Sequence, residues 1–172
     1  QKLVTAGVGS QGEMRYKLDD GEWQANIPTA TEAGEYKVYY KSIGNENFEE
    51  SEEGCVTATI ARRDISGAEV TLSAQLTYNT KEQTQAVESV VLEDFGNVKS
   101  YIVSGNTATD AGTDYELTVT GTGNFTGSVK VKFAVEPAWI IIGSVTVAPK
   151  SYDGSDEATV AKVTFTGIYA GD

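Results

Sequence analysis

The chain has 172 residues with a formal net charge of −12, no histidine and a single cysteine, Cys55. An acidic surface repels phosphate backbones, which argues against a nucleic-acid partner, and the missing histidines exclude the common catalytic triad and the common zinc site. The longest apolar run, residues 138–142, is too short to cross a bilayer, so we expect no membrane insertion in this segment. A lone cysteine forms no internal disulfide.

The first predicted element is a β-hairpin over residues 16–23. Asp20 and Gly21 stand between two alternating runs, and we expect Gly21 to supply the positive φ of the turn. Trp23 is expected to cover one side of this hairpin. Pro28 predicts an edge or a loop, because proline cannot donate to a strand ladder.

Residues 36–41 alternate as expected for a strand with one buried and one wet face. We predict that Tyr36, Val38 and Tyr40 point inward. The residues between them, Lys37, Tyr39 and Lys41, are predicted to point outward, which makes Tyr39 an exposed tyrosine. Cys55, in the following strand, is expected to be partly buried.

The same phrase occurs twice, in residues 31–48 and in residues 109–125. Gly34 and Gly112 are 78 positions apart, and Asn47 and Asn124 are 77 positions apart. A long phrase that returns at a near-constant interval predicts tandem copies of one unit. In the second copy the inward residues become Tyr115, Leu117 and Val119.

A third unit begins with residues 141–154, which resemble residues 65–80. We predict a first repeat at 1–62 that lacks its first strand, a complete second repeat at 63–137, and a truncated third repeat at 138–172; Gln1 would correspond to Gln83. Linkers of about four residues without a Gly/Ser tract imply limited freedom between repeats. Trp139 lies at the second linker, where it either plugs the joint or is buried in the third unit.

The predicted fold class is all-β, with tandem small immunoglobulin-like β-sandwich repeats. Short strands with turns every 8–12 residues suit this class, and Tyr36 and Tyr115 stand where the hydroxyl of a corner tyrosine bonds back to the backbone. The alternative is a β-grasp-like unit with one helix across a small sheet. The only candidate for that helix is the least strand-like stretch, residues 82–88, and it is short for a helix that crosses a sheet.

Three phrases carry a resemblance to a known group: residues 27–36, the Gly-x-x-Asn-Phe motif at 44–48 and 121–125, and Ser-Tyr-Asp-Gly at 151–154. The chain resembles the MBG and YDG-type bacterial immunoglobulin-like repeats of large surface proteins. The resemblance implies an extracellular, secreted or cell-surface adhesin-like protein in which the units serve as a stalk or spacer. Asn79-Thr80 in place of Asp-Gly and one extra residue before Tyr115 depart from the pattern only in loops.

We predict no catalytic, cofactor or metal residues, and therefore no enzyme. Cys55 has no histidine to act as its base. The acidic runs 19–22 and 49–53 could offer oxygens to calcium, but neither has an EF-hand spacing and the second copy lacks them. Asn124 stands in a glycosylation sequon, where we expect it to shape its own turn.

The sequence leaves two hypotheses about function. The first is a non-catalytic spacer whose partners are the neighbouring repeats of the same chain. The alternative is a module that binds carbohydrate or a host protein, with Tyr39 and Trp23 as stacking surfaces for sugars.

Overall fold

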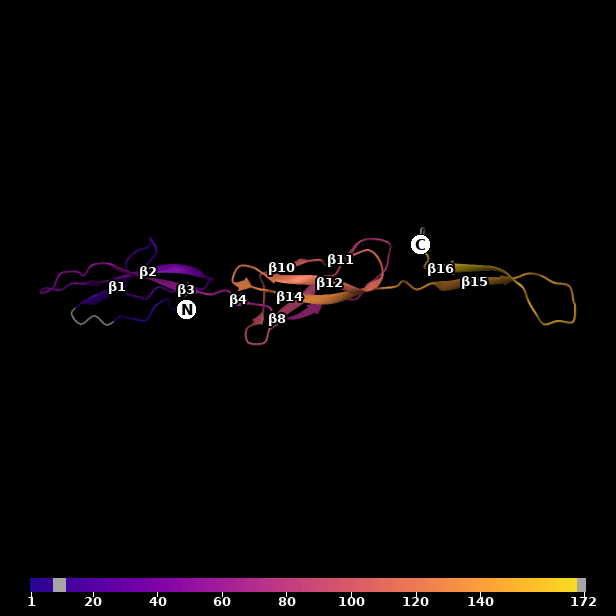
Figure 1. The fold of residues 1–172 in the computed structure, drawn as a ribbon, viewed down its shortest axis with the longest axis horizontal. Coiled ribbons are helices and arrows are strands. Elements are labelled where there is room, and N and C mark those ends of the chain that lie inside the picture. Colours follow the sequence, from indigo (N-terminus) through magenta and orange to yellow (C-terminus); the bar gives the residue numbers. More distant parts are fainter. Residues whose placement is uncertain (8–11, 170–172) are drawn as a thin grey trace. The chain divides into compact units, whose positions relative to one another are not determined.

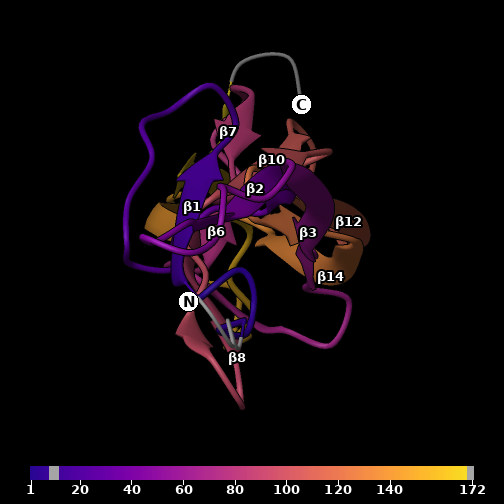
Figure 2. The same ribbon diagram turned by 90° about the vertical axis from the view of Figure 1, so that its left-hand side faces the viewer.

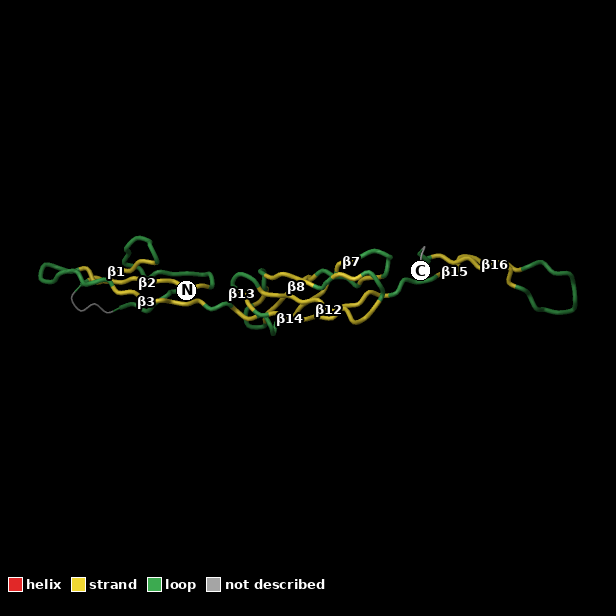
Figure 3. Tube along the Cα trace, turned by 45° about the horizontal axis from the view of Figure 1, so that its top comes forward, coloured by secondary structure: helices red, strands yellow, loops and turns green. Residues whose placement is uncertain are grey.

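The computed structural model describes residues 1–7 and 12–169, and it is all-β, with 0% helix and 53% strand (Figures 1 and 3). A helix that a β-grasp unit would need is therefore not found in the described part of the chain. The contacts divide the chain into two compact units. Unit 1 comprises Gln1–Ala68, Leu92–Ile102 and Thr120–Val129, and unit 2 comprises Glu69–Val91, Val103–Val119 and Lys130–Asp172.

Unit 1 is built on a three-stranded antiparallel sheet in the order β1-β2-β3 (Figures 1 and 2). Its strands are β1 (Glu13–Leu18), β2 (Gly34–Ile43) and β3 (Gly54–Ile60). Tyr16 is opposite Tyr40, and Leu18 is opposite Val38. Val38 is completely buried and Tyr16 is 5% exposed, so the inward face of this sheet holds the core of the unit.

The predicted inward face of β2 is correct, but it is only partly covered. Tyr36 is half-buried and Tyr40 is 38% exposed, although both lie on the same face as the buried Val38. The Tyr40 ring lies across Gly54, its partner on β3, where an added Cβ would be 2.4 Å from the ring. Tyr39, predicted to be exposed, is half-buried on the opposite face.

The predicted hairpin turn is present, but the residue with the positive φ is Asp19 rather than the predicted Gly21. The Gly21 amide donates to the Leu18 carbonyl at 2.9 Å, and the positive φ, 48°, belongs to Asp19. Asp19 is held there by β2, because its amide donates to the Lys37 carbonyl and its carboxylate accepts from the Lys37 amide. Pro28 lies in a loop, as predicted, and its carbonyl accepts a hydrogen bond from Leu3.

Unit 2 takes its strands from a three-stranded sheet in the order β5-β8-β9 and a four-stranded sheet in the order β10-β12-β14-β6. Strand β9 belongs to unit 1. The first sheet contains β5 (Glu69–Leu72), β8 (Val87–Leu92) and β9 (Gly96–Asn97). The second contains β6 (Leu76–Thr77), β10 (Tyr101–Ser104), β12 (Gly112–Gly121) and β14 (Ser128–Glu136). A short antiparallel pair joins β7 (Gln83–Thr84) to β11 (Thr107–Ala108).

Both sheets contribute side chains to the core of unit 2. The large buried apolar residues are Val90, Leu117, Val119, Phe133 and Val135. Leu117 and Val119 are completely buried, as predicted. Tyr115 is half-buried, with its ring stacked on Phe133 at 5.4 Å between centroids.

The last part of unit 2 is a hairpin of β15 (Ile141–Val147) and β16 (Val160–Thr166). Every residue of β15 is exposed. In β16 only Thr164 is half-buried, and the other residues are exposed. Trp139, just before β15, is 84% exposed. It is therefore neither a joint plug nor a core residue, because the described residues leave its ring uncovered.

The β15–β16 hairpin repeats the β5–β8 pair in detail. Both are antiparallel, and their registers match pair by pair along the aligned residues. The pairs Val70↔Val90 and Leu72↔Val87 correspond to Val145↔Val163 and Val147↔Val160. The irregularity between Thr71 and Leu72 recurs between Thr146 and Val147. A second irregularity, between Ile142 and Ser144, lies before the stretch that aligns with β5.

Candidate functional site

Two copies of one corner are present, and each is tied by its tyrosine as the sequence predicted. Corner 1 is residues 32–36, and corner 2 is residues 110–115. The Tyr36 hydroxyl donates to the Glu32 carbonyl at 2.8 Å, and the Tyr115 hydroxyl donates to the Asp110 carbonyl at 2.9 Å. These bonds fix the backbone at the start of β2 and of β12.

The two Gly-x-x-Asn-Phe motifs also form loops, which we call loop 1 (residues 44–48) and loop 2 (residues 121–125). In loop 2 the Phe125 amide donates to the Thr122 carbonyl at 3.0 Å, and the Thr122 amide donates to Ser100 at 3.0 Å. Gly123 has a φ of 62°, a conformation that glycine adopts without steric cost. The loop therefore presents the Asn124 side chain from a closed turn.

Asn124 connects loop 2 to corner 1, all within unit 1. Its Oδ1 accepts a hydrogen bond from the Ala33 amide at 2.7 Å, and its Nδ2 donates to the Glu32 carboxylate. Bonds to a charged group are stronger than neutral ones, although exposure of this pair weakens the effect. The prediction that Asn124 shapes its own turn was therefore incomplete: its side chain reaches a segment 91 residues away.

The linker after β3 is bound to the same loop. Strand β4 (Arg63–Asp64) runs parallel to β13 (Phe125–Thr126). The Arg63 amide donates to the Asn124 carbonyl at 2.8 Å, and the Ile65 amide donates to the Thr126 carbonyl at 2.9 Å. The backbone of this linker is thus paired, and Ile65 is completely buried.

Gly127 allows Asp64 to approach this pairing. Its φ is 77°, and an added Cβ would lie 1.9 Å from the Asp64 Oδ1 atom. The same oxygen accepts a hydrogen bond from the Ser66 amide at 2.9 Å, so Asp64 is not free to move aside without losing that bond.

An aromatic and ionic cluster completes the site. The rings of Phe95 and Phe125 meet edge to face at 5.4 Å, and the Arg63 guanidinium lies 5.1 Å from the Phe95 ring. Arg63 also pairs with Asp94, and this hydrogen bond holds the pKa of the Asp94 carboxyl below its usual range. Phe125 is 8% exposed, whereas Phe95 is 53% exposed.

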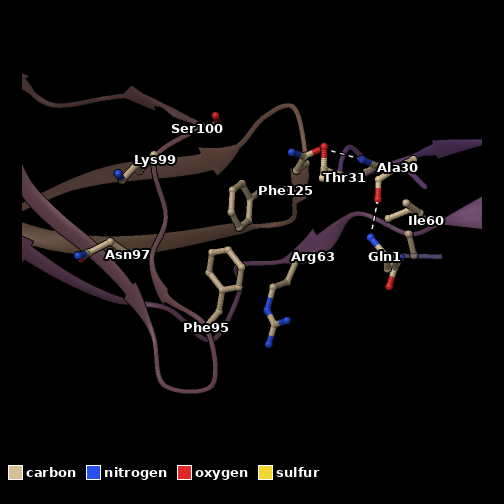
Figure 4. Close-up of a pocket in the computed structure, with 13 residues that line it drawn as sticks. Gln1, Ala30, Thr31, Ile60, Arg63, Phe95, Asn97, Lys99, Ser100 and Phe125 are labelled. Carbon is tan, nitrogen blue, oxygen red and sulfur yellow. Dashed lines mark hydrogen bonds between the residues drawn. The ribbon is translucent and has the colours of Figure 1, made fainter. Parts of the chain in front are cut away.

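These elements border an open hollow in unit 1 (Figure 4). Figure 4 shows the Phe95 and Phe125 rings next to each other and the Ala30 carbonyl bonded to the Gln1 nitrogen. The other lining residues are a mixture of apolar and polar ones, including Ile60, Asn97 and Lys99.

The two aromatic residues predicted to bind sugars do lie together, on the outer face of the unit 1 sheet. The Lys17 ammonium is 5.0 Å from the Trp23 ring and 4.6 Å from the Tyr39 ring. The Lys41 ammonium is 4.6 Å from the Trp23 ring. Both rings are half-buried, so the cations occupy ring faces that a sugar would need.

Cys55 and part of the acidic run 49–53 also lie on this outer face. Cys55 is exposed, contrary to the prediction, because it lies on the outer side of the edge strand β3. Glu53 pairs with Lys17 at 3.4 Å, and Glu50 pairs with Lys41. In the described part of the chain, no three His, Cys, Asp or Glu side chains are grouped to hold a metal ion.

No protein-family model, no curated protein and no solved structure matches this chain. Among residues 1–7 and 12–169, no helix has the length and apolar character needed to cross a membrane. The contact between Asn124 and corner 1 is the structural feature that sequence reasoning missed. The sequence signal nearest to it is the recurrence of both motifs at nearly the same interval.

Proposed function

We propose that the chain consists of tandem immunoglobulin-like β-sandwich repeats, at 1–62, 63–137 and 138–172. These repeats act as a non-catalytic spacer in a bacterial cell-surface or secreted adhesin-like protein. The observation that carries the proposal is the recurrence of one antiparallel strand pair, with the same register and the same irregularity, in β5–β8 and β15–β16. Such a recurrence is expected of repeated units that share one way of folding.

The corners and loops support a spacer with fixed joints. In unit 1 the Asn124 side chain, the β4–β13 pairing and the Phe95–Phe125 contact all act on the same short linker. A linker of this length with its backbone paired has little freedom to bend. A stretching force on the chain would then act on the hydrogen bonds of the linker rather than extend an unpaired linker.

The extracellular setting is what the resemblance to repeats of bacterial surface proteins implies, and a single cysteine and a dispersed negative charge are compatible with it. The spacer is favoured over sugar binding because lysine ammonium groups already cover Trp23 and Tyr39. A sugar would have to displace these cations, which also pair with Glu50 and Glu53.

The proposal is tested by measuring how tightly the joint holds its geometry. Cys55 is exposed, and Glu93, also in unit 1, is exposed as well. Spin labels on Cys55 and on Glu93→Cys would report their separation by double electron–electron resonance. A fixed joint gives a narrow distance distribution, which Asn124→Ala broadens. A broad distribution in the otherwise unaltered chain would rule out the stiff spacer.

A further inference from the structure

The last strand of the proposed second repeat, residues 63–137, carries the chain into the third. Strand β14 ends at Glu136, and β15 begins at Ile141. In a spacer, tension from the following residues therefore reaches this repeat through the carboxyl end of β14. The bonds between β14 and its neighbours decide how much tension the repeat withstands.

The carboxyl end of β14 is hydrogen-bonded to β6, a short strand from the beginning of the repeat. The two strands are parallel, with Val135 opposite Leu76 and Glu136 opposite Thr77. The Tyr78 amide donates to the Glu136 carbonyl at 2.8 Å. Strand β14 thus lies between β12 on one edge and β6 on the other.

Side chains add bonds on both edges of β14, and all of them belong to unit 2. On the β6 side, the Gln75 Nε2 atom donates to the Ala134 carbonyl at 2.8 Å, next to the backbone pairing. Two exposed ion pairs lie on the β12 side: Lys132 with Asp114 at 3.2 Å, and Lys130 with Glu116 at 2.6 Å. Exposed pairs of this kind contribute little to equilibrium stability.

The parallel direction of β6 and β14 determines how tension acts on their bonds. Strand β6 lies early in the repeat, so tension from the preceding residues pulls it toward its amino end. Tension from the following residues pulls β14 toward its carboxyl end. In a parallel pair these two pulls are opposite along a common axis, so they shear the bonds between the strands together instead of opening them one after another.

We propose that the β6–β14 pair is a mechanical clamp, which holds the exit strand of the repeat against tension along the chain. Gln75 is the side chain that reinforces the clamp, because its bond to Ala134 lies between the two sheared segments. The inference rests on the proposed spacer function, since it concerns how one repeat of a spacer bears load.

The experiment is single-molecule force spectroscopy of the 172-residue chain, held at its two ends under constant force. The unfolding step of the second repeat is recognised by its extension, which corresponds to the release of about 75 residues. Gln75→Ala should raise the rate of that step roughly three- to tenfold, because one hydrogen bond is lost from the sheared set. Forced unfolding is governed by the unfolding rate, so the effect appears there directly.

Gln83→Ala is the matched control. The Gln83 Nε2 atom donates to the Thr77 carbonyl at 3.0 Å, an exposed bond of the same kind that ends on β6 and does not reach β14. This variant should change the unfolding rate under force by less than about twofold, since its bond bears no part of the shear. Urea unfolding without force should give small and similar losses for both variants, so that only resistance to force separates them.

Equal effects of the two substitutions on the forced unfolding rate would overturn the proposal, and so would an unchanged rate in Gln75→Ala. The spin-label pair at Cys55 and Glu93→Cys lies in unit 1 and reports the linker before this repeat. A narrow label distance together with a force-insensitive Gln75→Ala would therefore remove the clamp and leave the stiff spacer in place.

Discussion

Replacing Asn124 by alanine removes two hydrogen bonds at once. The bond from the Ala33 amide is partly buried, and its loss leaves a donor with poor access to water. We expect that loss to cost about 1 kcal/mol. The bond to the Glu32 carboxylate is exposed, so it adds only about 0.5 kcal/mol. The total of about 1.5 kcal/mol corresponds to roughly tenfold in an equilibrium constant.

Hydrogen exchange measured by NMR checks this value locally. The Ala33 amide should exchange about tenfold faster in Asn124→Ala, because its protection depends on that acceptor. Asn47→Ala is the matched control, since Asn47 is the same residue in loop 1 with an exposed side chain. In dilute solution it should leave Ala33 exchange unchanged. Unchanged exchange in Asn124→Ala, or an equal effect of Asn47→Ala, would refute the role assigned to the Asn124 side chain.

Two further predictions concern backbone geometry and the corner. Gly127→Ala should destabilise the chain by about 2–4 kcal/mol in urea unfolding, since it combines a φ of 77° with a clash against Asp64. Gly67→Ala, with nothing within 4 Å of the new Cβ, should change stability by less than about 1 kcal/mol; equal effects would contradict the steric argument. Tyr115→Phe removes the bond to the Asp110 carbonyl and should cost about 0.5–1.5 kcal/mol by the same measurement. A neutral result would mean that water replaces the bond without loss.

The strand pattern could be predicted because it depends on near neighbours. Alternation placed Val38, Leu117 and Val119 on inward faces, and all three are completely buried. The Tyr36 and Tyr115 hydroxyl bonds span only four and five residues, so the corner motif contains all the atoms that it needs. The predicted turn failed in one detail, because the positive φ of Asp19 depends on two hydrogen bonds with Lys37 on another strand.

The sequence did not predict how deeply each residue on a correctly predicted inward face is buried. Tyr40 lies on the inward face, yet it is 38% exposed because little in the described part of the chain covers that end of the sheet. Trp139 is apolar and lies in an apolar run, yet it is 84% exposed. Period-two alternation tells which side of a strand a residue occupies, but it carries no information about whether another element packs there.

The sequence by itself determined the all-β class, the tyrosine corners and the recurrence of the Gly-x-x-Asn-Phe motif, because each depends on the spacing of residues close together in the chain. Only the tertiary structure decided which copy of a repeated residue has a partner. Phe125 is 8% exposed and Phe48 is 53% exposed, although they occupy the same position of the same motif. The physical reason is that burial and hydrogen bonding need two surfaces. For Asn124 the second surface lies 91 residues away along the chain.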